Sequence, residues 1–378
     1  MTLAICLAAG FAALALVFHL LSVVTAARRC RPAHESLPPP PGAEPVSLVI
    51  PVCGLDNFAE QTLGSAFRLN YPRYEILFCI ARADDPAVPL VRGLIALHPQ
   101  VEAQLLIGDE RISANPKLNN VCKGWRAAAH SLIVMPDSNV LMPSDYIQRL
   151  QRAWRADTGL VCSPPIGCAP ANFWAELECA FLNAYQARWQ YFSCSLGLGF
   201  AQGKTMMWRR EDLERAGGIR ALGREAAEDA ASTKIVRGAG LHVRLVDPPV
   251  RQPLGARKAG EVWRRQMRWA RLRRASFPLY YAPELLTGGM PPLAAIVFLS
   301  TQTGVPVLVA ALAFSFVWYG GEMWLAWKAQ WPLGPRALVC ALLRDLMLPV
   351  LWAGAMIGNS FEWRGNDMSA VEREAPAA

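Results

Sequence analysis

Charged side chains are scarce in this sequence of 378 residues: Asp, Glu, Lys and Arg make up 18%, against 53% hydrophobic residues. So apolar a composition excludes intrinsic disorder, and it excludes collagen-like and low-complexity architectures as well. We find no internal repeat. The chain is too apolar for an ordinary soluble enzyme and too polar for a bundle of spanning helices alone. The composition therefore predicts a soluble-type domain joined to a few membrane segments.

Two common site patterns are also missing. None of the ten cysteines belongs to a C-x-x-C pair, and Cys162 and Cys168, the closest two, lie in an apolar, proline-rich stretch. This argues against a zinc site or a disulfide framework and favours reduced thiols in a domain that faces the cytosol. A Walker A phosphate loop is excluded at Gly203-Lys204-Thr205, because only three residues separate Gly199 from Gly203 where that motif requires four.

The amino terminus has the features of a membrane anchor. Residues 1–27 contain no charged side chain apart from His19, and a helix of that length covers roughly 40 Å, enough to cross the hydrocarbon core. Arg28, Arg29 and Arg31 follow directly, so the positive-inside rule places the amino terminus outside and the next domain in the cytoplasm. A cleaved signal peptide is the alternative, but the basic n-region is missing and the apolar run is too long.

Further along, a proline-rich extended linker is predicted over residues 28–46. Membrane segments are predicted again over 286–361, with a cytoplasmic tail at 362–378. Within them Met290–Gly321 can span the membrane, with a possible kink at Pro306. Ala337–Phe361 contains the adjacent charges Arg344-Asp345, which must be paired or functional in a membrane, so this segment either spans or lies in the interface.

Residues 47–285 have the pattern of an α/β domain. Helix-like stretches near 57–68, 86–98, 117–129 and 144–156 alternate with five short β-rich runs: Ser47–Cys53, Glu75–Ala81, Ala103–Gly108, Ser131–Pro136 and Gly159–Ser163. Such alternation predicts a mostly parallel, doubly wound sheet. Sheets of this kind bind ligands at the carboxyl ends of their strands, so acidic residues there deserve the most weight.

Acidic residues follow two of these runs. Asp84 and Asp85 come after Glu75–Ala81, and Asp137-Ser138-Asn139 follows the fourth run. Carboxylates at one sheet edge are the hard oxygen ligands that a divalent cation bridging two phosphates needs. The alternatives are structural: Asp84 would cap the next helix, and the Asp-Ser-Asn triplet would form a turn.

Two later segments also suggest chemistry. Glu228-Asp229 either opens a helix or supplies Asp229 as a general base for an acceptor hydroxyl. Residues 251–274 hold nine basic residues and one acid, a net charge of +8, which predicts a polyanionic partner. Around 260–275 the pattern is that of a basic amphipathic helix at a membrane surface, with a solvated charged face as the alternative. No nucleic-acid recognition motif accompanies it, so nucleic acid is not an expected partner.

Taken together, the motifs resemble the ceramide glucosyltransferase-like family of membrane enzymes with a GT-A nucleotide-sugar fold. The resemblance covers about residues 47–285, and more loosely W-R-G at 363–365. It rests on Y-E-I-L-F-C-I-A-R-A-D-D-P-A (74–87), N-P-K-L-N-N (115–120), D-S-N (137–139), A-G-G-I (216–219), A-E-D (227–229) and R-Q-M-R-W (265–269). Three further strings are closer to the bacterial hopanoid-biosynthesis branch: S-P-P-I-G (163–167), W-A-E-L-E-C-A-F-L-N (174–183) and F-A-Q-G-K-T (200–205).

The resemblance implies a role for each matching residue. The donor would be held by Asp84, Asp85, Lys117 and Asp137, with a divalent metal, Mg²⁺ or Mn²⁺, on Asp137. Asp229 would be the catalytic base. Arg265, Arg268 and Trp269 would lie near the diphosphate and the acceptor. A histidine of the animal members has no counterpart near Ala187-Arg188, so this departure leaves the acceptor specificity of those members open for this chain.

The sequence therefore predicts an inverting glycosyltransferase, embedded in the bacterial inner membrane by several spans, with its catalytic domain in the cytoplasm. It would move GlcNAc or glucose from a UDP-sugar to a lipid hydroxyl, on a hopanoid polyol or a ceramide. One alternative is a processive polysaccharide synthase, which usually needs more spanning helices. The other is a non-enzymatic membrane scaffold, which would release no UDP.

Overall fold

The computed structural model describes residues 2–33, 35–358, 362–363 and 366–367. Two compact units are present. The helical unit consists of Met1–Arg31, Pro170–Phe192 and Ala256–Phe361, and the sheet unit of Pro32–Ala169, Ser193–Gly255 and Glu362–Ala378. Parts of the predicted 47–285 domain, namely 170–192 and 256–285, thus belong to the helical unit. Most of the predicted tail, with Arg364 and Gly365 of W-R-G, lies outside the described residues.

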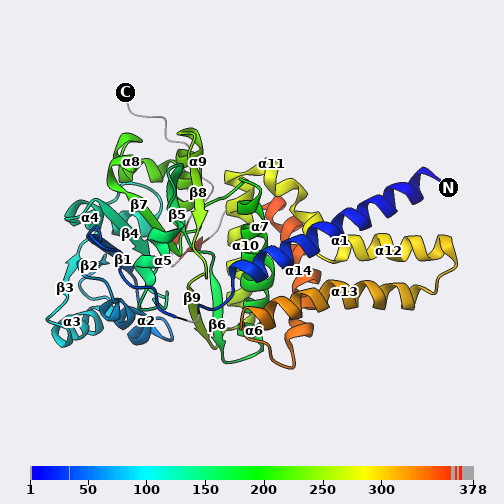
Figure 1. Cartoon of the computed structure of the whole chain (residues 1–378), viewed down its shortest axis with the longest axis horizontal. Coiled ribbons are helices and arrows are strands. Elements are labelled where there is room, and N and C mark those ends of the chain that lie inside the picture. Colours follow the sequence, from blue (N-terminus) through cyan, green and yellow to red (C-terminus); the bar gives the residue numbers. More distant parts are fainter. Residues whose placement is uncertain (1, 34, 359–361, 364–365, 368–378) are drawn as a thin grey trace. The chain divides into compact units, whose positions relative to one another are not determined.

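The sheet unit is built on a seven-stranded sheet of order β3-β2-β1-β4-β7-β5-β8 (Figure 1). Parallel pairing joins β1 to β2 and β4, β2 to β3, and β5 to β8, whereas β7 runs antiparallel to β4 and β5. The prediction of a mostly parallel sheet is therefore confirmed. Its strands are β1 (Val46–Val52), β2 (Tyr74–Ile80), β3 (Glu102–Ile107), β4 (Leu132–Pro136), β5 (Thr158–Cys162), β7 (Thr205–Arg209) and β8 (His242–Leu245).

Two short two-stranded sheets accompany it, β6 (Ile166–Pro170) with β9 (Arg251–Gly255), and β10 (Glu362–Trp363) with β11 (Asn366–Asp367). The helices of the sheet unit follow the predicted alternation. They are α2 (Ala59–Ser65), η1 (Ala66–Arg68), α3 (Ala87–Leu97), α4 (Pro116–Ala127), α5 (Tyr146–Ala153), α8 (Arg210–Arg215), η3 (Ile219–Arg224) and α9 (Glu228–Gly238).

Helices cover both faces of the sheet because its central strands are apolar on both sides. All seven residues of β1 are buried, as expected for a strand covered on both faces. Leu48 and Ile50 share one core cluster with residues of α2, α3 and α5. On the opposite face α4 packs so closely that a Cβ on Gly124 would lie 2.5 Å from the Val49 and Cys79 side chains. Asn120 of α4 donates to the carbonyls of Val52, at the end of β1, and Cys79, near the end of β2, which holds the first half of α4 near those strand ends.

The helical unit contains the apolar segments. Its helices are α1 (Leu3–Arg29), α6 (Phe173–Cys179), the π-helix η2 (Ala180–Ala187), α7 (Arg188–Ser195), α10 (Ala259–Ser276), α11 (Pro278–Tyr281), η4 (Ala282–Thr287), α12 (Met290–Thr303), α13 (Val307–Lys328) and α14 (Ala337–Ile357). Among the described residues, α1, α13 and α14 are long and apolar enough to cross a membrane. A fourth candidate is the bent pair Pro278–Thr287 and Met290–Thr303.

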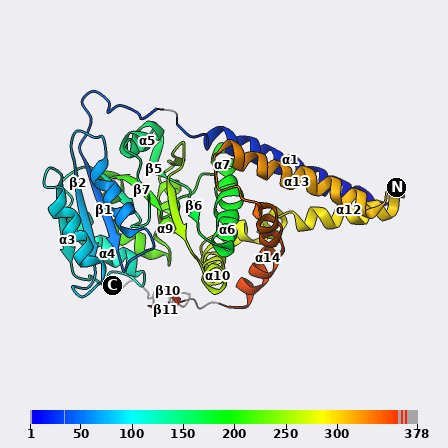
Figure 2. The same ribbon diagram turned by 90° about the horizontal axis from the view of Figure 1, so that it is seen from below.

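In place of one kinked span over Met290–Gly321, the chain forms a helical hairpin. Gly304 adopts a left-handed conformation (φ 73°) that ends α12, and Pro306 precedes the first turn of α13. Figures 1 and 2 show α12 and α13 side by side in opposite directions along α1, whereas α14 runs across this bundle. Within the unit, α14 therefore differs in direction from the other long apolar helices, and whether it spans or lies in the interface stays a prediction.

The charges of α14 are paired, as predicted for charges in an apolar segment. The Arg344 guanidinium donates to both oxygens of Glu322 on α13, at 2.9 and 3.0 Å, and to its neighbour Asp345 at 2.9 Å. Arg188 lies 3.6 Å from Glu322, and Asp345 accepts from Gly289 N at 2.8 Å. Arg188, Glu322, Arg344 and Asp345 are at most 1% exposed. Two positive and two negative side chains thus balance inside the unit.

Replacing Arg344 with Leu should destabilise the protein strongly, because Glu322 and Asp345 would be left buried without their main counterion. Breaking a buried pair in this way costs about 3–5 kcal/mol. Arg336→Leu is the matched control at the start of the same helix, where the arginine is 59% exposed. Thermal unfolding in detergent should show a large fall in the midpoint for Arg344→Leu alone. Equal midpoints for the two variants would contradict a stabilising role for the buried pair.

Candidate functional site

Lys117, near the start of α4, lies at the centre of a cluster of charged side chains. Its Nζ is 2.6 Å from Asp137 Oδ1 and 2.7 Å from Glu228 Oε1, and it donates to the carbonyl oxygen of Gly203 at 2.6 Å. Lys204, directly before β7, lies 2.8 Å from the other oxygen of Asp137. These four charged side chains are 11–22% exposed. The fold therefore concentrates two ammonium groups and two carboxylates in a partly buried site.

The N-P-K string builds the first turn of α4 and links it to α9. Asn115 caps α4: its Oδ1 accepts from the backbone nitrogens of Lys117 and Leu118 at 2.9 and 3.2 Å. Pro116 occupies the first helical position, where its missing N–H costs nothing. The Asn115 Nδ2 donates to Glu228 Oε2 at 2.7 Å. One capping residue thus orients both Lys117 and its partner Glu228.

Gly203 allows the backbone to pass close to this cluster. Its N–H donates to Asp229 Oδ2 at 3.1 Å, and its carbonyl accepts from Lys117. A Cβ at this position would lie 2.7 Å from Glu228 Oε1 and 3.0 Å from Lys117 Nζ. No side chain fits there without displacing the charged groups.

The D-S-N triplet after β4 forms a turn and also presents charge. The turn is closed by Val140 N, which donates to the Asp137 carbonyl at 3.2 Å. The Asp137 N–H donates to the carbonyl of Lys204 at 2.9 Å, so the triplet is fastened to the start of β7. The Lys204 Nζ contacts both Asp137 and Asn139, the latter at 3.1 Å. The structural and functional interpretations of the triplet are therefore compatible.

The charges of the cluster stabilise one another. Burial alone would raise the pKa of Asp137, but Lys117 and Lys204 outweigh it and hold this pKa well below its usual range. Burial would likewise lower the pKa of Lys117, yet the charges of Asp137 and Glu228 raise it. Asp137 is therefore a carboxylate at neutral pH, and both lysines contact it in this form.

The pKa of Asp229, in the first turn of α9, is shifted upward, opposite to that of Asp137. Its carboxylate accepts from Gly203 N and from Ala230 N at 2.8 Å. Burial, and next the charge of Glu228, raise the pKa of Asp229 from 3.8 to about 7, although Lys117 and these two hydrogen bonds oppose the shift. An acid with a pKa near neutrality can take up and release a proton under physiological conditions. Glu228-Asp229 thus both opens a helix and supplies a candidate base.

Asp84 and Asp85, the first acidic pair, have different roles. Asp85 holds the loop after β1: its carboxylate accepts from Gly54 N at 3.0 Å and from Ala87 N, at the start of α3, at 2.8 Å. Asp84 lies on the surface, where Arg82 donates to it at 2.8 Å. The helix-capping role that the alternative assigned to Asp84 is therefore performed by Asp85.

The basic R-Q-M-R-W helix forms as predicted, as α10 of the helical unit. Arg265 makes a very short ion pair with Glu178 of α6, a carboxylate that is 1% exposed. Arg268 and Trp269 are partly buried, whereas Gln266 is buried on the inner face of the helix. The predicted site residues are thus divided between the two units, with the acidic motifs in one and this helix in the other.

Asp137 has the right chemistry for a divalent metal but not a suitable arrangement. Oxygen ligands suit Mg²⁺ or Mn²⁺, yet each oxygen of Asp137 is already paired with an ammonium group, from Lys117 or Lys204. The described residues contain no group of three His, Cys, Asp or Glu side chains that could hold a metal ion. In this arrangement the site does not fit a metal held by protein ligands alone, and metal binding by Asp137 stays a prediction.

Sequence reasoning missed two members of the cluster. The sequence places Lys204 in the excluded Walker A loop and in the F-A-Q-G-K-T string without a role of its own, and it predicts Glu228 only as a helix-opening acid. A local signal did exist, because F-A-Q-G-K-T places a glycine and a lysine directly before a β-rich run. Their partners, however, lie 67 and 111 residues away in the chain, and spacing alone does not reveal such contacts.

Comparison with known proteins identifies similar chains. The family model described as glycosyl transferase family 21 matches residues 7–375. Ceramide glucosyltransferase 3 of Caenorhabditis elegans is 27% identical over 330 residues, which cover 85% of this chain and 72% of that protein. Ceramide glucosyltransferase 1 of the same organism is 26% identical over 371 residues, or 94% and 80%. The ceramide glucosyltransferase of Komagataella phaffii is 36% identical, but over only 31% of this chain and 24% of its own length.

Among solved structures, a mannosyltransferase from Pyrobaculum calidifontis, determined in complex with GDP-Man and Mn²⁺, matches with a TM-score of 0.52. The match covers 91% of this chain and 99% of that chain, at 18% sequence identity. At this identity the similarity concerns the fold. It confirms the predicted GT-A-type α/β fold.

The raised pKa of Asp229 predicts a pH-dependent effect on stability. Between about pH 4 and pH 7 the folded protein holds a proton that the unfolded chain has released, so stability falls as the pH rises. Asp229→Asn removes this penalty and should stabilise the protein more at pH 8 than at pH 4. Asp109→Asn, at an exposed site, is the control. Thermal midpoints at both pH values measure the effect, and a gain independent of pH would contradict the raised pKa.

Proposed function

Because the chain belongs to glycosyl transferase family 21, we propose that it transfers a single sugar from a UDP-sugar to a hydroxyl of a membrane lipid, with inversion at the anomeric carbon. The observation that carries this proposal is the environment of Asp229: its pKa is raised to about 7, and it accepts from Gly203 N, whose carbonyl accepts from Lys117 of the charged cluster. A base and a set of fixed positive charges are the two elements that such a displacement needs.

The reaction balances with these residues. The acceptor oxygen forms a bond to the anomeric carbon while its proton passes to Asp229. The bond from that carbon to the phosphate oxygen breaks, and UDP leaves with the electron pair. A base whose pKa lies near the working pH is effective in this step, because it is largely unprotonated and still accepts the proton readily. Attack opposite to the leaving group converts an α-linked donor into a β-linked product.

The positive charge for the leaving diphosphate is assigned to Lys117 and Lys204. The ammonium groups of both lysines are held in place by Asp137, so they need no rearrangement as negative charge develops on the phosphates. Asp137 then positions the lysines in addition to any contact with the donor. Asp85 would act by holding the loop after β1, where the family resemblance expects the nucleotide. Asp84 is exposed on the surface and is bonded to Arg82. It would contact the donor only if it gave up this bond.

The donor and the acceptor are proposed from the relatives. Two relatives that match most of this chain are ceramide glucosyltransferases, which supports a glycolipid product with UDP-glucose as donor and ceramide as acceptor. UDP-N-acetylglucosamine and a hopanoid polyol remain the second pair, because F-A-Q-G-K-T and two other strings resemble the hopanoid branch. In both cases the acceptor is a lipid that carries hydroxyl groups.

We place the protein in the bacterial inner membrane, with the sheet unit in the cytoplasm. Arg28, Arg29 and Arg31 follow the apolar helix α1, which favours a cytoplasmic position for that end. The α12–α13 turn lies at the same end of the helical bundle as the amino terminus (Figure 1). Both would then lie on the outer side of the membrane, and α13 would lead the chain back to the cytoplasmic side. Arg265, Arg268 and Trp269, on the basic helix α10, would then meet lipid head groups.

The proposal is tested with purified, detergent-solubilised protein supplied with UDP-glucose or UDP-N-acetylglucosamine and with ceramide or a hopanoid polyol. We expect UDP release and a β-linked lipid that carries one sugar. Asp229→Asn should lower turnover by about 10²–10⁴-fold, because the base is lost, while UDP binding stays close to that of the wild type.

The exposed Asp109→Asn variant serves as the control and should keep full turnover. Mass spectrometry of the lipid product separates the alternatives. A polymer attached to the lipid would favour a processive synthase. Absence of UDP release with every donor and lipid would support a non-enzymatic scaffold. Wild-type turnover in Asp229→Asn would remove this residue from the role of base.

A further inference from the structure

The helical unit contains a cavity with a volume of about 310 Å³. It is lined mainly by α6 and η2, by the last turns of α13, by the connection after α13 and by the first turns of α14, and all of its lining residues belong to this unit. Ligand pockets typically have about 300–1,000 Å³, and one water molecule takes up roughly 30 Å³, so the cavity has room for about ten water-sized groups. We call it the Glu176 pocket, after the partly exposed glutamate that lines it.

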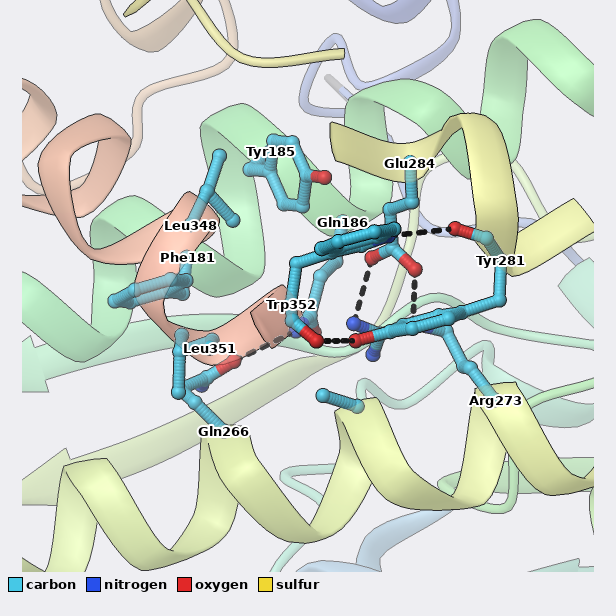
Figure 3. Close-up of a pocket in the computed structure, with 11 residues that line it drawn as sticks. Phe181, Tyr185, Gln186, Gln266, Arg273, Tyr281, Glu284, Leu348, Leu351 and Trp352 are labelled. Atoms are coloured by element: carbon cyan, nitrogen blue, oxygen red, sulfur yellow. Dashed lines mark hydrogen bonds and ion pairs between the residues drawn. The ribbon is translucent and has the colours of Figure 1, made fainter. Parts of the chain in front are cut away.

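The pocket is open because the η2 side chains that line it are small. Ala180, Asn183 and Ala184 of this π-helix line it, whereas Phe181 and Tyr185 line a second cavity of the unit. Figure 3 shows these two aromatic side chains around the second cavity, whose volume of about 20 Å³ suits a single water molecule. Because π-helices are rare and occur frequently at functional sites, η2 favours a binding role for the larger cavity.

The Glu176 pocket lies at one end of a candidate membrane span. Met323 and Ala326, in the last two turns of α13, line it. The helix then ends with Trp327, which is 62% exposed, and Lys328, whose Nζ lies 4.6 Å from the centre of the Trp327 ring. Tryptophan and lysine at the end of an apolar helix are typical of the level of the lipid head groups. Phospholipid head groups are therefore the ligands available at this depth.

The charged groups that line the pocket are acidic. They are Glu176 and Glu322, and the described residues of the lining include no lysine, arginine or histidine. Glu322 is buried, and both of its oxygens accept from Arg344. Glu176 keeps 27% of its side chain exposed, and its ion-pair partner Arg336 lies 4.0 Å from it, beyond hydrogen-bond distance. The pocket thus offers a carboxylate to a cationic ligand and would repel a wholly anionic one.

Arg336 adds a positive charge beside this carboxylate. It directly precedes Ala337, which lines the pocket, and its side chain is 59% exposed. Arginine suits phosphate groups, because its planar guanidinium donates two parallel hydrogen bonds. Glu176 and Arg336 therefore match a zwitterionic head group, in which an ammonium group and a phosphate are joined by a short linker.

We propose that the Glu176 pocket binds the ammonium head group of a membrane phospholipid, phosphatidylethanolamine. The ammonium group would donate to Glu176, the phosphate would accept from Arg336, and the methylene groups between them would pack against Trp331 and Ala337, which line the pocket. This lipid is bound and not consumed, so the inference goes beyond the proposed function and does not rest on it. By joining η2 to α13 and α14, the bound lipid would also stabilise the helical unit.

Binding is measured with the purified, detergent-solubilised protein and three phospholipids that carry the same acyl chains: phosphatidylethanolamine, phosphatidylcholine and phosphatidylglycerol. Native mass spectrometry gives the bound fraction at each lipid concentration. The trimethylammonium group of phosphatidylcholine cannot donate a hydrogen bond, and phosphatidylglycerol has no positive charge. One charge-assisted hydrogen bond corresponds to about a tenfold change in the dissociation constant. Phosphatidylethanolamine should therefore bind about tenfold more tightly than either of the other lipids.

The key variant is Glu176→Gln, which keeps the size of the side chain and removes the carboxylate. Its affinity for phosphatidylethanolamine should fall about tenfold, to the level of phosphatidylcholine. Glu261→Gln is the matched control, because it removes a carboxylate from α10 of the same unit, outside the lining of the pocket. This control should keep the tenfold preference. Thermal midpoints without added lipid show whether either variant alters folding.

A second variant, Ala337→Leu, tests the site even if Glu176→Gln fails to fold. It places a larger side chain at a partly exposed position of the lining and should weaken the binding of phosphatidylethanolamine about tenfold or more, by occlusion of the pocket. Val339→Phe is its control, since Val339 is 53% exposed on the same helix and does not line the pocket. The control should bind this lipid as the wild type does.

A preference for phosphatidylethanolamine that requires Glu176 and is lost in Ala337→Leu would support the proposal. Equal binding of the three lipids by the wild type, or a preference that survives in folded Glu176→Gln, would overturn it. Unchanged binding in Ala337→Leu would also overturn it. Equal binding that Ala337→Leu abolishes would assign the pocket to an acyl chain and reject the head group. The assay contains no UDP-sugar, so this preference and UDP release can fail independently of each other.

Discussion

The ion pairs of Lys117 hold the sheet-unit site together. One ammonium group contacts Asp137 after β4, Glu228 at the start of α9, and the carbonyl of Gly203 before β7, all within 2.7 Å. Three segments that are distant in sequence are thereby brought to one point. The same interaction sets the local electrostatics. It keeps Asp137 ionised. The charge of Lys117 also opposes, without cancelling, the rise in the pKa of Asp229 to about 7 that burial and the charge of Glu228 cause. These interactions produce a site in which fixed positive charge accompanies an acid whose pKa lies near neutrality.

Much of the fold was predictable from sequence because its signals are local. The five β-rich runs correspond to β1 to β5, and the stretches near 86–98 and 117–129 correspond to α3 and α4. The antiparallel strand β7 and the edge strand β8, which pairs with β5, were not predicted, since sheet order depends on pairing between distant segments. The hairpin of α12 and α13 was interpreted as one kinked span, because hydropathy records apolar length and not the direction of a helix after Gly304.

The site was predictable only in part, for the same physical reason. Asp137, Asp229 and Lys117 were identified through motifs, and the structure brings them together with Glu228 and Lys204. The proximity of the two lysines to Asp137 could not be read from spacing, and it changes the interpretation of that residue: the expected metal ligand has both oxygens engaged by ammonium groups. In the helical unit, the charges of α14 were predicted to be paired or functional, and the structure pairs them. The Glu176 pocket, by contrast, becomes visible only when the packing of α13 and α14 against η2 is known.

The central claim is that Lys117 and Lys204 provide the positive charge for the donor diphosphate. Calorimetric titration of UDP into the purified protein, with EDTA and then with Mg²⁺ or Mn²⁺, tests it most directly. Wild-type binding should persist in EDTA, and Lys117→Met and Lys204→Met should each weaken it about 10–100-fold, the loss typical of a charge-assisted hydrogen bond. Lys123→Met, which removes a partly buried lysine of the same helix bonded to the Gly108 carbonyl, should have little effect. Binding that disappears in EDTA, with both lysine variants equal to the wild type, would contradict the account and assign the diphosphate to a metal.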